Sequence, residues 1–105
     1  AQDDLELAER FLRQALTSQV DYPETFAQLA GVLHERGNDL QARAFVGRYL
    51  AVAPATPGML LLGHAIEKAL KDEAAAAAFS DRLKKEFPNS DQARSLDGTP
   101  GQNPG

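Results

Sequence analysis

The 105-residue chain repeats its own pattern at an interval of 34 positions. Two sets of residues recur at this interval, namely Ala8, Ala42 and Ala76, and Phe11, Phe45 and Phe79. Pro54 and Pro88 are separated by the same interval. A period of this length is that of a helix–turn–helix unit, which buries its apolar face by stacking on neighbouring units. The repeat therefore predicts an all-α protein.

Helix–turn–helix units of this length are typical of tetratricopeptide (TPR) repeats. We therefore predict TPR hairpins stacked as a right-handed α-solenoid. A stack of this kind presents a concave groove to other proteins. The architecture favours a protein-binding scaffold, and we expect no enzyme activity.

One TPR domain is predicted over residues 1–96. Its expected parts are the second helix of a truncated repeat, two complete repeats and a short capping helix, at 3–19, 23–54, 56–88 and 90–96. Residues 97–105 are rich in Gly and Pro, and this composition predicts a disordered tail.

The first complete repeat contains its own start and stop signals. Pro23 is suited to the first position of a helix, where its missing N–H would have no partner in any case. Gly37 can adopt the left-handed conformation that ends the first helix. Asp39 can accept backbone N–H bonds at the start of the second helix. These residues predict a turn around 36–38.

The second complete repeat is predicted to contain a shift in register. Its first helix repeats the apolar pattern of the preceding one at an offset of 33, with Met59, Leu62, Gly63 and Ile66 in the places of Phe26, Leu29, Ala30 and Leu33. Because its second helix returns to an offset of 34, we expect one extra residue in the turn at 70–72. Lys71 occupies that turn instead of the usual glycine.

The helix at 3–19 corresponds to the second helix of a repeat, without a first helix before it. Leaving Leu5, Phe11 and Leu12 in water would cost about 1.5–3 kcal/mol for each large side chain. We therefore expect further repeats upstream in the natural protein. In isolation, we expect self-association through this exposed N-terminal helix.

First-helix positions that do not pack inward should line the partner groove. With the offset of 33 applied to the second repeat, the expected groove residues are Glu24, Ala27, Gly31, His34, Glu35, Leu60, His64, Glu67 and Lys68. Small residues such as Ala27 and Gly31 suit an apolar partner segment and supply no positive charge. The groove therefore does not match the TPR clamps that hold C-terminal carboxylates with Lys, Arg and Asn.

Both histidines of the chain fall on the expected groove, so we considered a metal site at His34, Glu35, His64 and Glu67. Neither histidine pairs with another ligand at i, i+4 in a recognised motif. The two helices that carry them should also lie about 10 Å apart. We predict no metal site.

Composition excludes several other classes of function. The chain has 11 basic and 15 acidic residues, a net charge of −4, and its Lys and Arg are scattered, so a nucleic-acid partner is not expected. No apolar run approaches the roughly 20 residues that span a membrane. There is no cysteine, no phosphate-binding loop and no nucleophile motif, and we predict neither catalytic residues nor a cofactor.

Three stretches resemble one particular family of TPR proteins: residues 42–54, 61–72 and 82–94. Together they are similar to the C-terminal part of the type IV pilus biogenesis and stability lipoproteins, the PilW/PilF pilotins, over about residues 5–95. The resemblance implies around six TPR units and a lipid anchor upstream, at the periplasmic face of the outer membrane. It also implies a pilus secretin subunit as the partner, which the protein helps to reach that membrane and assemble.

One part of this resemblance is shared more widely. The Phe87-Pro88-Asn89-Ser90 ending also occurs in other periplasmic TPR proteins, including those of outer-membrane barrel assembly. The alternative interpretation is therefore a general periplasmic TPR scaffold for barrel or envelope-machinery assembly.

Overall fold

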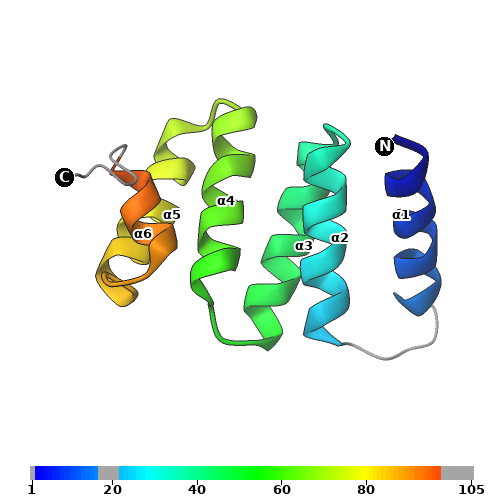
Figure 1. Cartoon of the computed structure of the whole chain (residues 1–105), viewed down its shortest axis with the longest axis horizontal. Coiled ribbons are helices and arrows are strands. Elements are labelled where there is room, and N and C mark those ends of the chain that lie inside the picture. The colour runs from blue at the N-terminus through cyan, green and yellow to red at the C-terminus, as the bar shows by residue number, and fades with distance from the viewer. Residues whose placement is uncertain (1, 17–21, 98–105) are drawn as a thin grey trace. The chain divides into compact units, whose positions relative to one another are not determined.

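A computed structural model of the chain describes residues 2–16 and 22–97. Within these ranges the chain forms α-helices and no strand: α1 (Gln2–Leu16), α2 (Pro23–Glu35), α3 (Asp39–Val52), α4 (Pro57–Ala69), α5 (Glu73–Glu86) and α6 (Asp91–Leu96) (Figure 1). The predicted all-α class with helix–turn–helix hairpins is confirmed. Residues 17–19 of the first expected helix, and the expected tail from residue 98 on, lie outside the described residues.

The chain divides into two units, residues 1–54 and residues 55–105. In the first unit α2 packs against both α1 and α3, and in the second α4 packs against α5 and α6 (Figure 1). None of the helices in the described ranges is long and apolar enough to cross a membrane.

The core of the first unit lies between α2 and α3. It consists of fully or almost fully buried side chains: Phe26, Leu29, Ala30, Leu33, Ala42, Phe45 and Val46. The rings of Phe26 and Phe45 lie 6.2 Å apart at a tilt of 31°. As predicted, Pro23 is the first residue of α2 and Gly37 has a φ of 82°, so the α2–α3 turn requires the left-handed conformation that glycine adopts without strain.

Asp39 does not have the capping role that the sequence suggested. Asn38 is the residue that precedes α3, and it makes no capping bond through its side chain. The Asp39 carboxylate instead lies 2.5 Å from His34 Nδ1. The partial positive charge of the helix N-terminus favours a carboxylate in the first turn even when that carboxylate bonds to a side chain.

A polar network joins α1 to the α2–α3 hairpin. Glu9 pairs with Arg13 on its own helix at 2.7 Å and with Arg36, the residue after α2, at 2.5 Å. Arg13 also donates to Gln41 Oε1 on α3 at 2.6 Å and lies over the Phe45 ring. The hydrogen bond from Arg13, aided by Arg36, lowers the pKa of Glu9 below its ordinary value.

The apolar side of α1 is much less covered than that of α3. Phe11 is 62% exposed, whereas Phe45, at the equivalent position of α3, is 7% exposed because α2 covers it. Leu7, one turn before Phe11, is also exposed. Leu5 and Leu12, which were expected to lie in water with Phe11, are half-buried, and the truncated repeat stays a prediction.

The expected shift in register of the second repeat is wrong. α4 begins 34 residues after α2, at Pro57, and α5 begins 34 residues after α3, at Glu73. The α4–α5 turn therefore has the same length as the α2–α3 turn. Lys71 takes the place of Gly37 and adopts the same left-handed conformation, with a φ of 62°.

The error came from aligning Gly63 with Ala30 as equivalent small residues. The structure instead places Gly63 at the position of Leu29, where it makes room for an aromatic ring. A Cβ on Gly63 would lie 2.6 Å from Phe79 Cε1. A large residue on α5 thus fills the volume that a large residue on α2 fills in the first unit.

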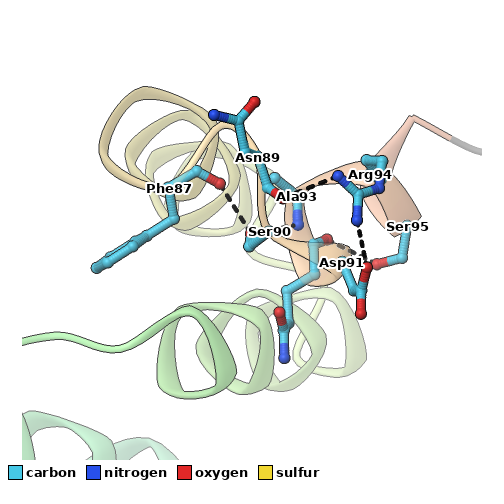
Figure 2. Close-up of polar contacts among 8 residues, drawn as sticks. Phe87, Asn89, Ser90, Asp91, Ala93, Arg94 and Ser95 are labelled. Carbon is cyan, nitrogen blue, oxygen red and sulfur yellow. Dashed lines mark hydrogen bonds and ion pairs between the residues drawn. The ribbon is translucent and has the colours of Figure 1, made fainter.

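α6 closes the second unit over a cluster of Leu60, Leu83 and Ala93, with Phe87 and Leu96 packed against it. The Ser90 hydroxyl accepts a bond from the Ala93 N–H at 3.0 Å and donates to the Phe87 carbonyl at 2.8 Å (Figure 2). Ser90 therefore acts as the N-cap of α6.

Replacing Gly63 with alanine should destabilise the second unit. The added Cβ collides with the Phe79 ring, and overpacking of this kind costs about 1–3 kcal/mol. Gly47→Ala is the matched control, because nothing lies within 4 Å of its Cβ position and alanine favours a helix by about 0.5–1 kcal/mol. Urea denaturation should show a lower free energy of unfolding for G63A and an equal or higher one for G47A. Equal stability of G63A and G47A would contradict the close packing of α4 on α5.

The Glu9 network predicts a dependence of stability on pH. Because the folded-state pKa of Glu9 is lowered, its contribution is fully present above the ordinary pKa of 4.5 and is lost as the pH falls through the folded-state value. In thermal unfolding the midpoint temperature of wild type should be higher than that of Glu9→Gln at pH 7. The difference between the two midpoints should shrink below pH 4.5. The exposed Glu6 gives the control, since Glu6→Gln should stay within about 0.5 kcal/mol of wild type. A wild-type advantage over E9Q that is unchanged at pH 3 would count against this assignment.

Candidate functional site

The outer face of α2 carries the expected groove residues of the first unit. Glu24 and Glu35 are exposed at the two ends of this face, and Ala27 and Gly31 are half-buried between them. Nothing lies within 4 Å of the position that a Cβ on Gly31 would occupy. The face is therefore a low apolar strip with a carboxylate at each end, and its helix backbone is accessible to a partner. We call Glu24, Ala27, Gly31 and Glu35 the α2 face.

His34, the remaining expected groove residue of the first unit, turns away from the α2 face toward α3. Its Nδ1 contacts the Asp39 carboxylate at 2.5 Å. The second unit repeats this arrangement 34 residues later, where Lys68 Nζ lies 3.3 Å from Glu73 Oε1. In both hairpins a basic side chain near the end of the first helix meets an acidic residue at the start of the second. Such a pair suits the partial charges of both helix termini.

Two expected groove residues of the second unit are buried, which corrects their placement. Leu60 is 0% exposed and belongs to the cluster with Leu83 and Ala93, and Glu67 is 4% exposed. Both were assigned to the groove through the offset of 33. At the observed offset of 34 they correspond to the core residues Phe26 and Leu33.

The observed register gives a different set of outward positions on α4. The equivalents of Glu24, Ala27, Gly31, His34 and Glu35 are Gly58, Leu61, Ala65, Lys68 and Ala69. Leu61 and Ala65 are half-buried like Ala27 and Gly31, and Gly58 and Ala69 are exposed like Glu24 and Glu35, whereas Lys68 is exposed and His34 is half-buried. We call Gly58, Leu61 and Ala65 the α4 face. The spacing from Pro23 to Pro57 was the signal in the sequence that could have identified it.

His64 is also turned into its own hairpin. Its Nδ1 lies 3.0 Å from the backbone carbonyl oxygen of Ala76 on α5. Because a carbonyl only accepts, Nδ1 must donate, and the ring bridges α4 and α5. His64 is therefore a packing residue of the second unit.

The described residues contain no group of three or more His, Asp or Glu side chains arranged to hold a metal ion. His34 and His64 each bond through Nδ1 to a group of their own hairpin. The structure therefore does not bring them together with Glu35 and Glu67 as the metal ligands considered from the sequence. What the two units offer is apolar helix surface, with a carboxylate at each end of the α2 face and Lys68 beside the α4 face. Such a surface suits the binding of a polypeptide segment.

Two solved structures are similar to this chain. The crystal structure of PilW, described as a widely conserved type IV pilus biogenesis factor, matches with a TM-score of 0.83 and 30% sequence identity. The match covers 90% of this chain and 44% of that one. PilF of Pseudomonas aeruginosa matches in fold with a TM-score of 0.79 and 20% identity, over 91% of this chain and 43% of that one.

This chain thus spans less than half the length of either of these proteins. No family model matches the sequence, and no curated protein matches it either. The similarity to PilW is one of sequence as well as fold, and the predicted resemblance to the PilW/PilF family is confirmed.

The contact between His64 and Ala76 predicts the tautomer of the neutral ring. Nitrogen-15 NMR should find the proton of neutral His64 on Nδ1, because only that nitrogen faces the carbonyl. A neutral His34 should show the same tautomer, since its Nδ1 faces a carboxylate, which also only accepts. A neutral His64 with its proton on Nε2 would show that the bond between α4 and α5 is not made.

Proposed function

Because the chain belongs to the PilW/PilF-like TPR proteins, we propose that it is a protein-binding scaffold in type IV pilus biogenesis. The observation that carries this proposal is the α2 face. Its small residues leave the helix accessible, and its two terminal carboxylates favour a partner segment with an apolar centre and basic ends. The α4 face offers a similar apolar strip, with Lys68 beside it.

The proposed partner is a subunit of the pilus secretin. On this proposal the full-length protein is a pilotin that is lipid-anchored at the periplasmic face of the outer membrane. It helps the secretin to reach that membrane and to assemble there, without catalysis. The resemblance of residues 42–54, 61–72 and 82–94 to the pilotins supports this assignment. So does the description of PilW as a type IV pilus biogenesis factor.

The alternative is a general periplasmic scaffold, and it rests on the shared Phe87-Pro88-Asn89-Ser90 ending. In this chain Phe87 packs against the cluster of Leu60, Leu83 and Ala93, and Ser90 caps α6. Both residues thus have local structural roles that are independent of any partner. The ending therefore favours neither function, and the similarity to PilW favours the pilus.

Gly31→Arg should abolish partner binding without disturbing the fold. The side chain has open space at this position, and it would place a bulky positive charge in the centre of the apolar strip. Isothermal titration of the full-length protein with purified secretin subunit should show at least a tenfold loss of affinity, about 1.4 kcal/mol.

Gly47→Arg is the matched control, because Gly47 is an exposed helical glycine on α3 with equally open space. It should bind secretin as wild type does, and both variants should keep wild-type circular dichroism. Equal affinities of G31R and G47R would remove the α2 face from the proposal. Absence of secretin binding by wild type, together with normal secretin rings in a deletion strain, would reject the pilus function.

A further inference from the structure

Arg48 on α3 is held in place by two aromatic rings. Its guanidinium carbon lies 5.3 Å from the Phe26 ring centroid and 5.4 Å from the Phe45 ring centroid. Both rings are almost completely buried, while Arg48 itself is exposed. Contacts of this kind engage the guanidinium without using its N–H groups. The side chain is therefore restrained while its hydrogen-bond donors stay available.

Beside Arg48 the surface of the first unit is hollowed. The hollow is lined by Phe26, Arg48, Ala51 and Val52, and all four belong to α2 and α3. Val52 is 52% exposed, although it is a large apolar residue. The hollow thus combines one cation with an accessible apolar wall, and it is separate from the α2 face.

The second unit shows what is missing at this position. Arg82 is the equivalent of Arg48 at the interval of 34, and its Nε donates to the Glu86 carboxylate at 2.7 Å. Glu86 is in turn the equivalent of Val52. In the first unit an apolar residue therefore stands where the second unit has the carboxylate that pairs with the arginine. Across residues 2–16 and 22–97, no carboxylate is within ion-pair distance of Arg48.

We propose that this hollow binds an acidic, apolar segment of a partner protein. The carboxylate of a Glu or Asp side chain takes the place relative to Arg48 that Glu86 takes relative to Arg82. A neighbouring apolar side chain of the same segment packs on Val52 and Ala51. Arginine suits this role because its planar fork binds both carboxylate oxygens, and the two rings have already restrained it.

Charge favours a polypeptide over a phosphate-bearing partner. The chain has a net charge of −4, so a nucleic acid or an anionic lipid surface would meet overall repulsion. A phosphate group also carries more negative charge than one cation neutralises, and Arg48 is the single cation among the described residues that line the hollow. A segment with one carboxylate next to an apolar side chain matches both Arg48 and the apolar wall of the hollow.

The test is a titration followed by nitrogen-15 NMR of the chain. The probe is a capped nine-residue peptide with one glutamate flanked by leucines in a glycine–serine background. The Arg48 Nε–H and Val52 amide resonances should shift in a saturable manner. The same peptide with glutamine in place of glutamate should bind at least tenfold more weakly.

Val52→Glu supplies the missing carboxylate within the chain and should abolish binding of the glutamate peptide. Val52→Gln is the matched control with the same shape and no charge, and its affinity should stay within a few-fold of wild type. No shift in wild type at millimolar peptide, or equal binding by V52E and V52Q, would overturn the proposal. Shifts at Arg48 and Val52 that depend on protein concentration alone would overturn it in favour of a second copy. Because the readout is confined to α3, a negative result leaves secretin binding by the α2 face as a separate question.

Discussion

The close approach of two helices within each hairpin is the constraint on which the rest of this structure depends. Ala42 and Ala76 are almost completely buried at the point of approach, one in each unit. A larger side chain there would separate the helices and expose the apolar residues beside it. The two units reach this geometry with different residues: the first has the buried Leu29, whereas the second has Gly63, which makes room for Phe79. The two repeats therefore keep the same close approach of their helices although the residues that fill the space between them differ.

The interval of 34 also repeats the electrostatics of the turn. His34 and Asp39 pair across the first turn, and Lys68 and Glu73 pair across the second. Each pair places a basic group at the end of one helix and a carboxylate at the start of the next, where the helix termini favour them. The chemistry of the side chains changes between the repeats while their positions stay the same. An imidazole on a surface helix can thus have a structural role.

The elements whose signals are local could be predicted from the sequence. Pro23 and Gly37 set the bounds of α2 through their own backbone conformations, and Ser90 sets the start of α6 through hydrogen bonds to residues three positions away. The register of α4 could not be obtained in this way. It depends on Phe79, a residue on another helix whose ring fills the space over Gly63. Sequence alignment of small residues with small residues missed that compensation, and it placed the buried Leu60 and Glu67 in the groove.

Comparison of the two repeats then separates residues with a structural role from those without one. His64 bonds to the α5 backbone, Ser90 caps α6, and Arg82 pairs with Glu86, so their identities are explained within the fold. No such polar bond explains Ala27, Gly31 or Arg48 within the described residues, and open space surrounds the Cβ position of Gly31 while Arg48 is exposed. A scaffold needs such positions, because binding energy is available only where side chains and backbone have not already been satisfied internally. The α2 face and the Arg48 hollow are therefore the surfaces of the first unit that we propose as binding sites.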